Sequence, residues 1–329
     1  MFTRRAAIVT GSRALAGAAL WAGTSPSRAQ VPAGPGRRAG HAMAFHAGAA
    51  AVCLLGGDHD DLNRDDPREQ VWLWNGVVWG MRRTPLAPPA VSLVAAASDH
   101  ARRSVLIFGG FTVIGPRKYG PPAGDLWELD ADLRWRQHAP DGLRPPARHH
   151  HAIAFDGRRG RLVMYGGIDA ADVWDTDVWE WDRTRWHRIQ TPDGPGQRAH
   201  HAMAYDSARG RIVLRGGTRV DKSHPTDTWE WDGAAWHMAA SDGPGPGGAY
   251  RMAYDQARAV TVLFGGDTCV WNGTAWTRVA TASAPAARQV HALAYDPVRA
   301  RLVMHGGSVN QVNAAETWEW DGTAWSRLG

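Results

Sequence analysis

The sequence is poor in cysteine and in the short motifs that mark common enzyme classes. Only two cysteines, Cys53 and Cys269, occur in 329 residues. The chain has no Gly-x-Ser-x-Gly, no Walker A pattern and no His-Glu-x-x-His, so the usual signatures of serine hydrolases, P-loop enzymes and zinc peptidases are missing. No segment after the first 29 residues is apolar for long enough to cross a membrane.

An excess of positive charge is also missing once the N-terminus is set aside. The formal charge of +5 includes four arginines in the first 29 residues, which contain no acid. Without them, 37 − 4 = 33 basic residues face 32 acidic ones, which leaves +1. The composition therefore predicts no nucleic-acid partner.

The N-terminus has the pattern of an export signal. Arg4-Arg5 opens a positive region, residues 14–23 are apolar, and small residues precede Gln30. We predict a cleaved signal over 1–29, a linker over 30–37 and a periplasmic or extracellular protein. Export by the twin-arginine or the general route stays open, because bulky residues do not follow Arg4-Arg5.

One sequence unit is repeated six times after this segment. The clearest copy has Arg198-x-x-His201, a double glycine at Gly216-Gly217, a Trp pair and a final Trp236. The other double glycines are Gly56-Gly57, Gly109-Gly110, Gly166-Gly167, Gly265-Gly266 and Gly306-Gly307. Such a period predicts an array of equal structural units rather than two unrelated domains.

Within each copy the apolar residues alternate with a period of two, as in β-strands. Asp-Gly and Asn-Gly pairs before the last Trp are typical of hairpin turns. Each copy therefore predicts a four-stranded antiparallel sheet, whose strands we call A to D. Six such sheets bury both faces when they pack around an axis. We predict an all-β fold, a six-bladed β-propeller over 38–329, with blades at 38–85, 90–140, 148–192, 198–241, 247–282 and 288–328.

The double glycine, the downstream Trp and the preceding Arg-x-x-His resemble the Kelch repeat family over residues 37–328. The resemblance implies a propeller but no single function, since Kelch propellers include scaffolds, binding modules and a few enzymes. Copies 2 and 5 depart from the pattern, with Ser92-Leu-Val in one and Gly247-Gly-Ala-Tyr250 in the other. Each blade is complete in itself, whereas many Kelch propellers share one blade between the two termini.

Cys53 falls on strand B of blade 1 and Cys269 on strand C of blade 5. Blade 6 separates them in a closed ring, and a disulfide needs Cα atoms within about 7 Å. We therefore predict two free, buried thiols.

The start of strand A, the end of strand B and the loops that vary most share one face, here called the Gly-Gly face. Arg and His recur there at the mouth of the central channel. This candidate ligand-binding ring consists of Arg38, His41, Arg148, His151, Arg198, His201, Arg288 and His291. Two interpretations stay open: the side chains anchor loops by binding carbonyls, or they bind an anionic ligand.

A metal site built from neighbouring histidines of two adjacent blades is a third interpretation. These histidines are His149, His150, His151, His200 and His201. Alternate residues of a strand point to opposite faces, so we expect no metal and no cofactor. The Asp-rich segment 58–69 lacks the EF-hand spacing and is predicted to be a solvated loop. Phe111, Tyr119 and Trp174 are candidate stacking contacts for a ligand. Trp174 lies outside the repeat pattern, and two interpretations of it stay open: it caps the core or it stacks on a ligand.

These observations favour an exported, monomeric, non-catalytic binding or scaffold protein whose partner is a glycan, a small anionic ligand or a protein. The alternative is an isomerase like the sialic acid mutarotases, which also fold as Kelch propellers and would use Arg for the substrate carboxylate. A radical copper oxidase like galactose oxidase is excluded. Its cofactor needs a Cys beside metal ligands, and neither Cys53 nor Cys269 meets that need.

Overall fold

The computed structural model describes residues 34–59, 70–115, 118–245 and 250–328. The predicted signal at 1–29 lies outside the described residues, as do residues 30–33 of the predicted linker. Within the described ranges all regular structure is β-strand. No helix in this part of the chain has the length and apolarity needed to cross a lipid bilayer.

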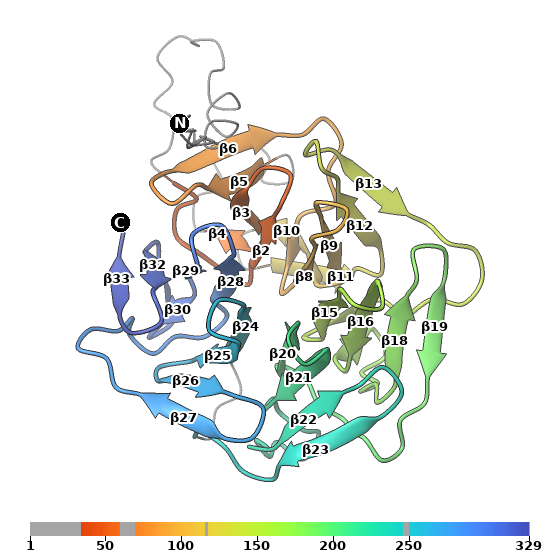
Figure 1. The fold of residues 1–329 in the computed structure, drawn as a ribbon. Helices are drawn as coiled ribbons and strands as arrows, with labels where there is room; N and C mark the ends of the chain where they lie inside the picture. Colours follow the sequence, from red (N-terminus) through yellow and green to blue (C-terminus); the bar gives the residue numbers. More distant parts are fainter. Residues whose placement is uncertain (1–33, 60–69, 116–117, 246–249, 329) are drawn as a thin grey trace, which may run out of the picture. The chain divides into compact units, whose positions relative to one another are not determined.

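Six four-stranded antiparallel sheets form around a central axis (Figure 1), and the predicted all-β propeller is confirmed. Blades 1 to 3 consist of β2 (Ala42–His46), β3 (Ala51–Leu55), β5 (Gln70–Trp74) and β6 (Trp79–Arg83); β8 (Ala95–Asp99), β9 (Ser104–Phe108), β12 (Leu126–Leu129) and β13 (Trp135–His138); and β15 (Ala152–Asp156), β16 (Arg161–Tyr165), β18 (Val178–Trp181) and β19 (Trp186–Ile189). Blades 4 to 6 consist of β20 (Ala202–Asp206), β21 (Arg211–Arg215), β22 (Thr228–Trp231) and β23 (Trp236–Ala240); β24 (Arg251–Asp255), β25 (Val260–Phe264), β26 (Thr268–Trp271) and β27 (Trp276–Val279); and β28 (Ala292–Asp296), β29 (Arg301–His305), β32 (Thr317–Trp320) and β33 (Trp325–Arg327).

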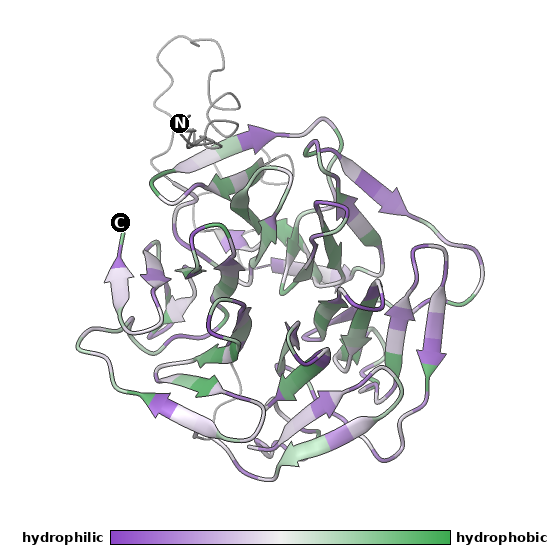
Figure 2. Ribbon diagram, in the orientation of Figure 1, coloured by the Kyte–Doolittle hydropathy of each residue, from purple (hydrophilic) through white to green (hydrophobic). Residues whose placement is uncertain are grey.

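The innermost strands form a closed ring. Each of β2, β8, β15, β20, β24 and β28 contacts the next, and β28 contacts β2. The four strands of each sheet follow one another along the chain, so the termini exchange no strand between blades. Figure 2 shows that the inner strands are mostly hydrophobic and that the outer strands carry more polar residues.

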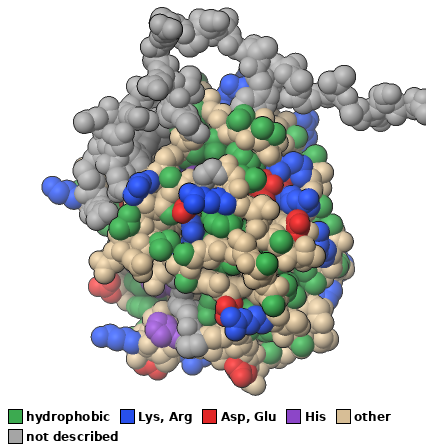
Figure 3. All heavy atoms as spheres, turned by 90° about the vertical axis from the view of Figure 1, so that its left-hand side faces the viewer, with side chains coloured by type: hydrophobic (Ala, Val, Ile, Leu, Met, Phe, Trp, Pro, Cys, Tyr) green, Lys and Arg blue, Asp and Glu red, His purple; other side chains and the backbone are tan. Residues whose placement is uncertain are grey.

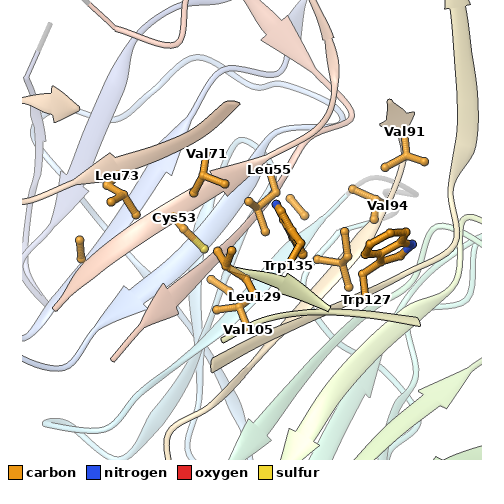
Figure 4. Packing of buried hydrophobic residues seen from close by; sticks show 14 residues of the cluster. Cys53, Leu55, Val71, Leu73, Val91, Val94, Val105, Trp127, Leu129 and Trp135 are labelled. Carbon is orange, nitrogen blue, oxygen red and sulfur yellow. The ribbon is translucent and has the colours of Figure 1, made fainter. Parts of the chain in front are cut away.

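Small side chains of one blade pack against large ones of the next. On β2, Met43 and Phe45 contact Ala292 and Ala294 of blade 6, whereas the alternate residues join the core shared with blade 2. Figure 4 shows Cys53 and Leu55 facing Val105 and Trp135 across that boundary. Both cysteines are buried and free, as predicted. Fully burying one such apolar side chain contributes roughly 1.5–3 kcal/mol.

The double glycines are explained by close approach between blades. A Cβ on Gly166 would lie 2.5 Å from the carbonyl oxygen of Arg198 in the next blade. Gly167 has φ +86° and donates its N–H to that same oxygen at 3.0 Å. A side chain at either position would push the blades apart, so glycine is required where strand B ends.

Short strands cover the Gly-Gly face. β1 (Arg38–Ala39) pairs with β4 (Asp58–His59), β14 (Arg148–His149) with β17 (Ile168–Asp169), and β30 (Ser308–Val309) with β31 (Val312–Asn313). Between β9 and β12 of blade 2, the chain forms a hairpin of β10 (Phe111–Gly115) and β11 (Lys118–Pro122), with β7 (Val91–Ser92) beside it. On the side of the propeller in view in Figure 3, basic and acidic side chains lie next to one another.

Candidate functional site: the channel mouth on the Gly-Gly face

The four arginines of the predicted ring are buried beneath the mouth. Their exposed fractions are 6% or less. In each, Nη1 donates to the carbonyl of the first glycine of its own blade, at 2.9–3.2 Å. Arg38, Arg148, Arg198 and Arg288 thus tie the segment before strand A to the end of strand B.

Three of these arginines also pair with a carboxylate. Arg148 pairs with Asp175 at 2.7 Å, Arg198 with Asp227 at 2.9 Å, and Arg288 with Glu316 at 3.3 Å. Arg38 instead donates Nε to the carbonyl of Pro35 at 3.0 Å. The geometry favours the anchoring interpretation, and ligand binding by these four guanidiniums stays a prediction.

The four histidines of the ring stack edge-on against the preceding blade. His151 meets Phe108 at 5.5 Å between ring centroids, His201 meets Tyr165 at 5.8 Å, and His291 meets Phe264 at 5.6 Å. His41 meets His305 at 5.7 Å. Burial lowers the pKa of every one of these imidazoles, to about 3 for His151, so all are neutral at neutral pH.

A cavity of about 120 Å³ opens inside the ring of inner strands. His41, His151 and His201 line it, whereas His291 is not among its lining residues. Five inner strands begin with an alanine that faces this cavity or its rim, and the strand of blade 5 begins with Arg251. Arg251 is not among the site residues predicted from the sequence. The signal was present, since copy 5 aligned on its double glycine places an arginine where the other copies have alanine.

Arg251 is a cation without an anionic partner among the described residues. Its Nη1 donates to the carbonyl of Tyr250 at 3.0 Å, and no described carboxylate lies within ion-pair distance. Burial lowers its pKa to about 10, so the guanidinium stays charged at neutral pH. A desolvated charge of this kind favours an anion as its partner.

Two further histidines flank Arg251. His150 and His200 have left-handed φ values of 57° and 61°, which turn them toward the channel mouth, and their rings lie 3.8 Å apart. Burial, followed by neighbouring positive groups that include Arg251, lowers the pKa of His150 to about 2 and of His200 to about 4. The mouth therefore holds one guanidinium among neutral imidazoles.

Of the three predicted stacking residues, Phe111 and Tyr119 lie together, whereas Trp174 lies apart from them. Phe111 stacks on His149 with ring centroids 3.9 Å apart and also approaches Tyr119. Tyr119 is 44% exposed and donates its hydroxyl to Asp58. Trp174 is half-buried and does not line the cavity. Phe111 and Tyr119 thus form a wall connected to the mouth through His149, whereas Trp174 does not join it.

A metal centre finds no support in the described ranges, where no group of three or more His, Cys, Asp or Glu side chains is arranged to hold an ion. Most of the Asp-rich segment, residues 60–69, lies outside the described residues.

Comparison with known proteins supports the fold. No family model matches the chain. Dynein regulatory complex subunit 7 of Chlamydomonas reinhardtii is 36% identical over 67 residues, and this match spans 20% of the chain and only 5% of that protein. The solved structure of YjhT is similar with a TM-score of 0.68, over 91% of this chain and 99% of that chain, at 10% identity. At this identity the likeness speaks for the fold alone. Together with the repeated sheets it is consistent with a Kelch-type propeller.

Proposed function

We propose that the protein binds a small anionic group, above all a carboxylate, at the channel mouth through Arg251. The observation that carries this proposal is the charge of Arg251 in a cavity whose described lining contains no acid. A carboxylate accepts two parallel N–H bonds from a guanidinium. His150 and His200 line the same cavity and would donate further N–H bonds to the carboxylate.

The size of the cavity limits how much of the ligand it holds. About 120 Å³ is small beside the roughly 300–1,000 Å³ of pockets that enclose a whole small ligand. The cavity suits the acidic group of a larger molecule, such as a sugar acid or an acidic peptide side chain. The rest of that molecule would lie on the Gly-Gly face beside Phe111 and Tyr119. We further propose that this binding takes place outside the cytoplasm, as the N-terminal pattern predicts.

Replacing Arg251 with alanine tests the proposal. The substitution copies the residue that starts the other inner strands, so folding is expected to persist. We expect glucuronic acid, N-acetylneuraminic acid and a short Asp/Glu peptide to raise the melting temperature of the wild type more than that of Arg251→Ala, whereas glucose should affect both proteins equally.

Lys222→Ala is the matched control, since it removes one exposed cation from the same face and should keep the ligand response. An equal melting shift in Arg251→Ala and wild type would contradict the proposal.

A second candidate function is an isomerase of the sialic acid mutarotase type, favoured by the neutral imidazoles beside Arg251. In a 2-keto sugar acid the anomeric carbon bears the carboxylate. Binding that carboxylate at Arg251 would bring the anomeric hydroxyl toward His150 and His200. The fold likeness to YjhT is compatible with this candidate.

The reaction would need one proton acceptor and one proton donor. One neutral imidazole of the pair His150 and His200 takes the proton of the anomeric hydroxyl, while the N–H of the other gives a proton to the ring oxygen. The bond between the anomeric carbon and the ring oxygen breaks, which gives an open-chain ketone and a hydroxyl group. Reclosure of that hydroxyl on the other face of the carbonyl, with the protons returned, yields the other anomer.

Saturation-transfer NMR on N-acetylneuraminic acid separates the two candidates. Isomerase action predicts faster exchange between anomer signals, lost in Arg251→Ala and reduced about tenfold or more in His150→Gln and His200→Gln. Binding with unchanged exchange would rule out the isomerase and leave the binding function standing.

A further inference from the structure

The channel continues from the mouth to the opposite side of the propeller, here called the turn face because the A–B turns lie there. Met43, Ile153, Met203 and Met252 line both halves and form an apolar waist between them. Beyond this waist the channel widens into a cavity of about 650 Å³. The volume falls in the range of roughly 300–1,000 Å³ typical of small-molecule sites.

Aromatic side chains from five blades contribute to the wall of this wider cavity. The fourth residue of the inner strand is aromatic in five blades, as Phe45, Phe155, Tyr205, Tyr254 and Tyr295. Two hydroxyl groups in this set are fixed by the preceding blade: the N–H of Arg158 donates to Tyr205 at 3.1 Å, and that of Ala257 donates to Tyr295 at 3.0 Å. These rings are therefore held in place before any ligand arrives.

Blade 2 interrupts the aromatic wall. Ser98 occupies its fourth position. His100 lies beside this gap and stacks on Phe45 with centroids 6.0 Å apart. Burial lowers the pKa of His100, so its ring is neutral at neutral pH. Ser98 and His100, together with the exposed Ser207 and Gln256, place hydroxyl, imidazole and amide groups at the rim of the cavity.

No carboxylate lines this cavity among the described residues, although an aspartate ends each inner strand of blades 2 to 6. Asp156, Asp206 and Asp296 are at most 4% exposed and accept N–H bonds within their own A–B turns. Among the described lining residues, Arg158 is the one Lys or Arg. The pocket thus lacks the acids that would hold a cationic ligand.

We propose that the turn-face cavity is a binding site for a neutral pyranose ring, as a free sugar or at the end of a short neutral glycan. The apolar C–H faces of a pyranose pack on aromatic side chains. Its hydroxyl groups match the neutral donors and acceptors of the rim. This site is independent of the anion site, because the waist separates the two cavities.

The test is a titration of neutral sugars against the full chain, by ligand-observed NMR and calorimetry with glucose, maltose, cellobiose and chitobiose. We expect at least one to bind the wild type. Ser98→Tyr completes the aromatic ring with a residue that three other blades carry there, and should weaken that binding about tenfold or more by filling the gap.

Two further variants keep the result interpretable. Ser207→Ala with Gln256→Ala alters only exposed rim residues and should also weaken binding, even if Ser98→Tyr folds poorly. Arg251→Ala, at the other mouth, should leave it unchanged. The proposal is overturned if none of the four sugars binds, if binding survives the rim variant, or if it is lost in Arg251→Ala.

Discussion

Arginines of this propeller have opposite roles according to their partners. Arg198 is fully buried, with the carboxylate of Asp227 at 2.9 Å and the carbonyl of Gly216 at 3.0 Å. Burial acts to raise the pKa of Asp227, but the bonds from Arg198 bring it below its ordinary value. Arg251 has no such partner in the described structure. The first arginine holds the fold together, and the second is available to a ligand.

This contrast predicts that replacing Arg198 lowers the unfolding free energy and that replacing Arg251 does not. Arg198→Ala leaves a buried carboxylate without its main partner, which costs about 3–5 kcal/mol of unfolding free energy. Arg251→Ala removes an unpaired, desolvated charge and should not lower that free energy. Urea unfolding of both variants beside Lys222→Ala measures the difference. Equal losses in the two arginine variants would show that Arg251 is structural as well.

At the scale of strands and turns, the boundary between blades 2 and 3 shows how neighbouring blades compensate for each other. In blade 3 the turn arginine, Arg159, binds Glu180 of its own blade and the carbonyl of Gly233 in the next. The equivalent Arg102 of blade 2 is 56% exposed. Arg183, in place of the usual turn glycine of blade 3, reaches Asp99 and Glu128 instead. Blade 3 thus adds a second cation to Asp99, which also pairs with Arg102 of its own blade at 3.6 Å.

The strands of the blades could be predicted from the sequence because the signals for them are local. Alternating residues, double glycines and Asp-Gly turns each act over a few positions. The hairpin at 111–122 was missed because Gly115, Gly120 and Pro121 interrupt its alternation. Arg251 was missed for a different reason. Its importance depends on five alanines from other blades and on two histidines in left-handed backbone, which only ring closure brings together.

At the scale of the whole propeller, ring closure gives a channel with two chemically different mouths. The Gly-Gly mouth holds Arg251 among imidazoles, whereas the turn-face mouth has aromatic residues and no acid among its described lining residues. The closed ring also buries His41, His151, His201, His291 and His305 between blades, at most 6% exposed. A single sheet would leave these histidines in water, so their neutral state is a property of the closed ring.

This burial predicts an acid-sensitive fold. Burial lowers the pKa of His151 and His305 to about 3, against about 6.5 for a histidine in the unfolded chain. Below that higher value the unfolded chain takes up protons that the folded protein does not. The unfolding free energy therefore falls as the pH falls, by up to about 1.4 kcal/mol per pH unit for each such histidine. The loss continues until the folded pKa is reached.

His151→Val isolates one of these protons, because blade 2 carries Val94 at the same position. Urea unfolding between about pH 7 and about pH 4.5 should give a shallower pH slope for this variant, by up to about 1.4 kcal/mol per pH unit. The exposed His224→Ala should keep the wild-type slope. If His151→Val keeps it too, His151 is protonated in the folded state, and burial between the blades does not hold it neutral.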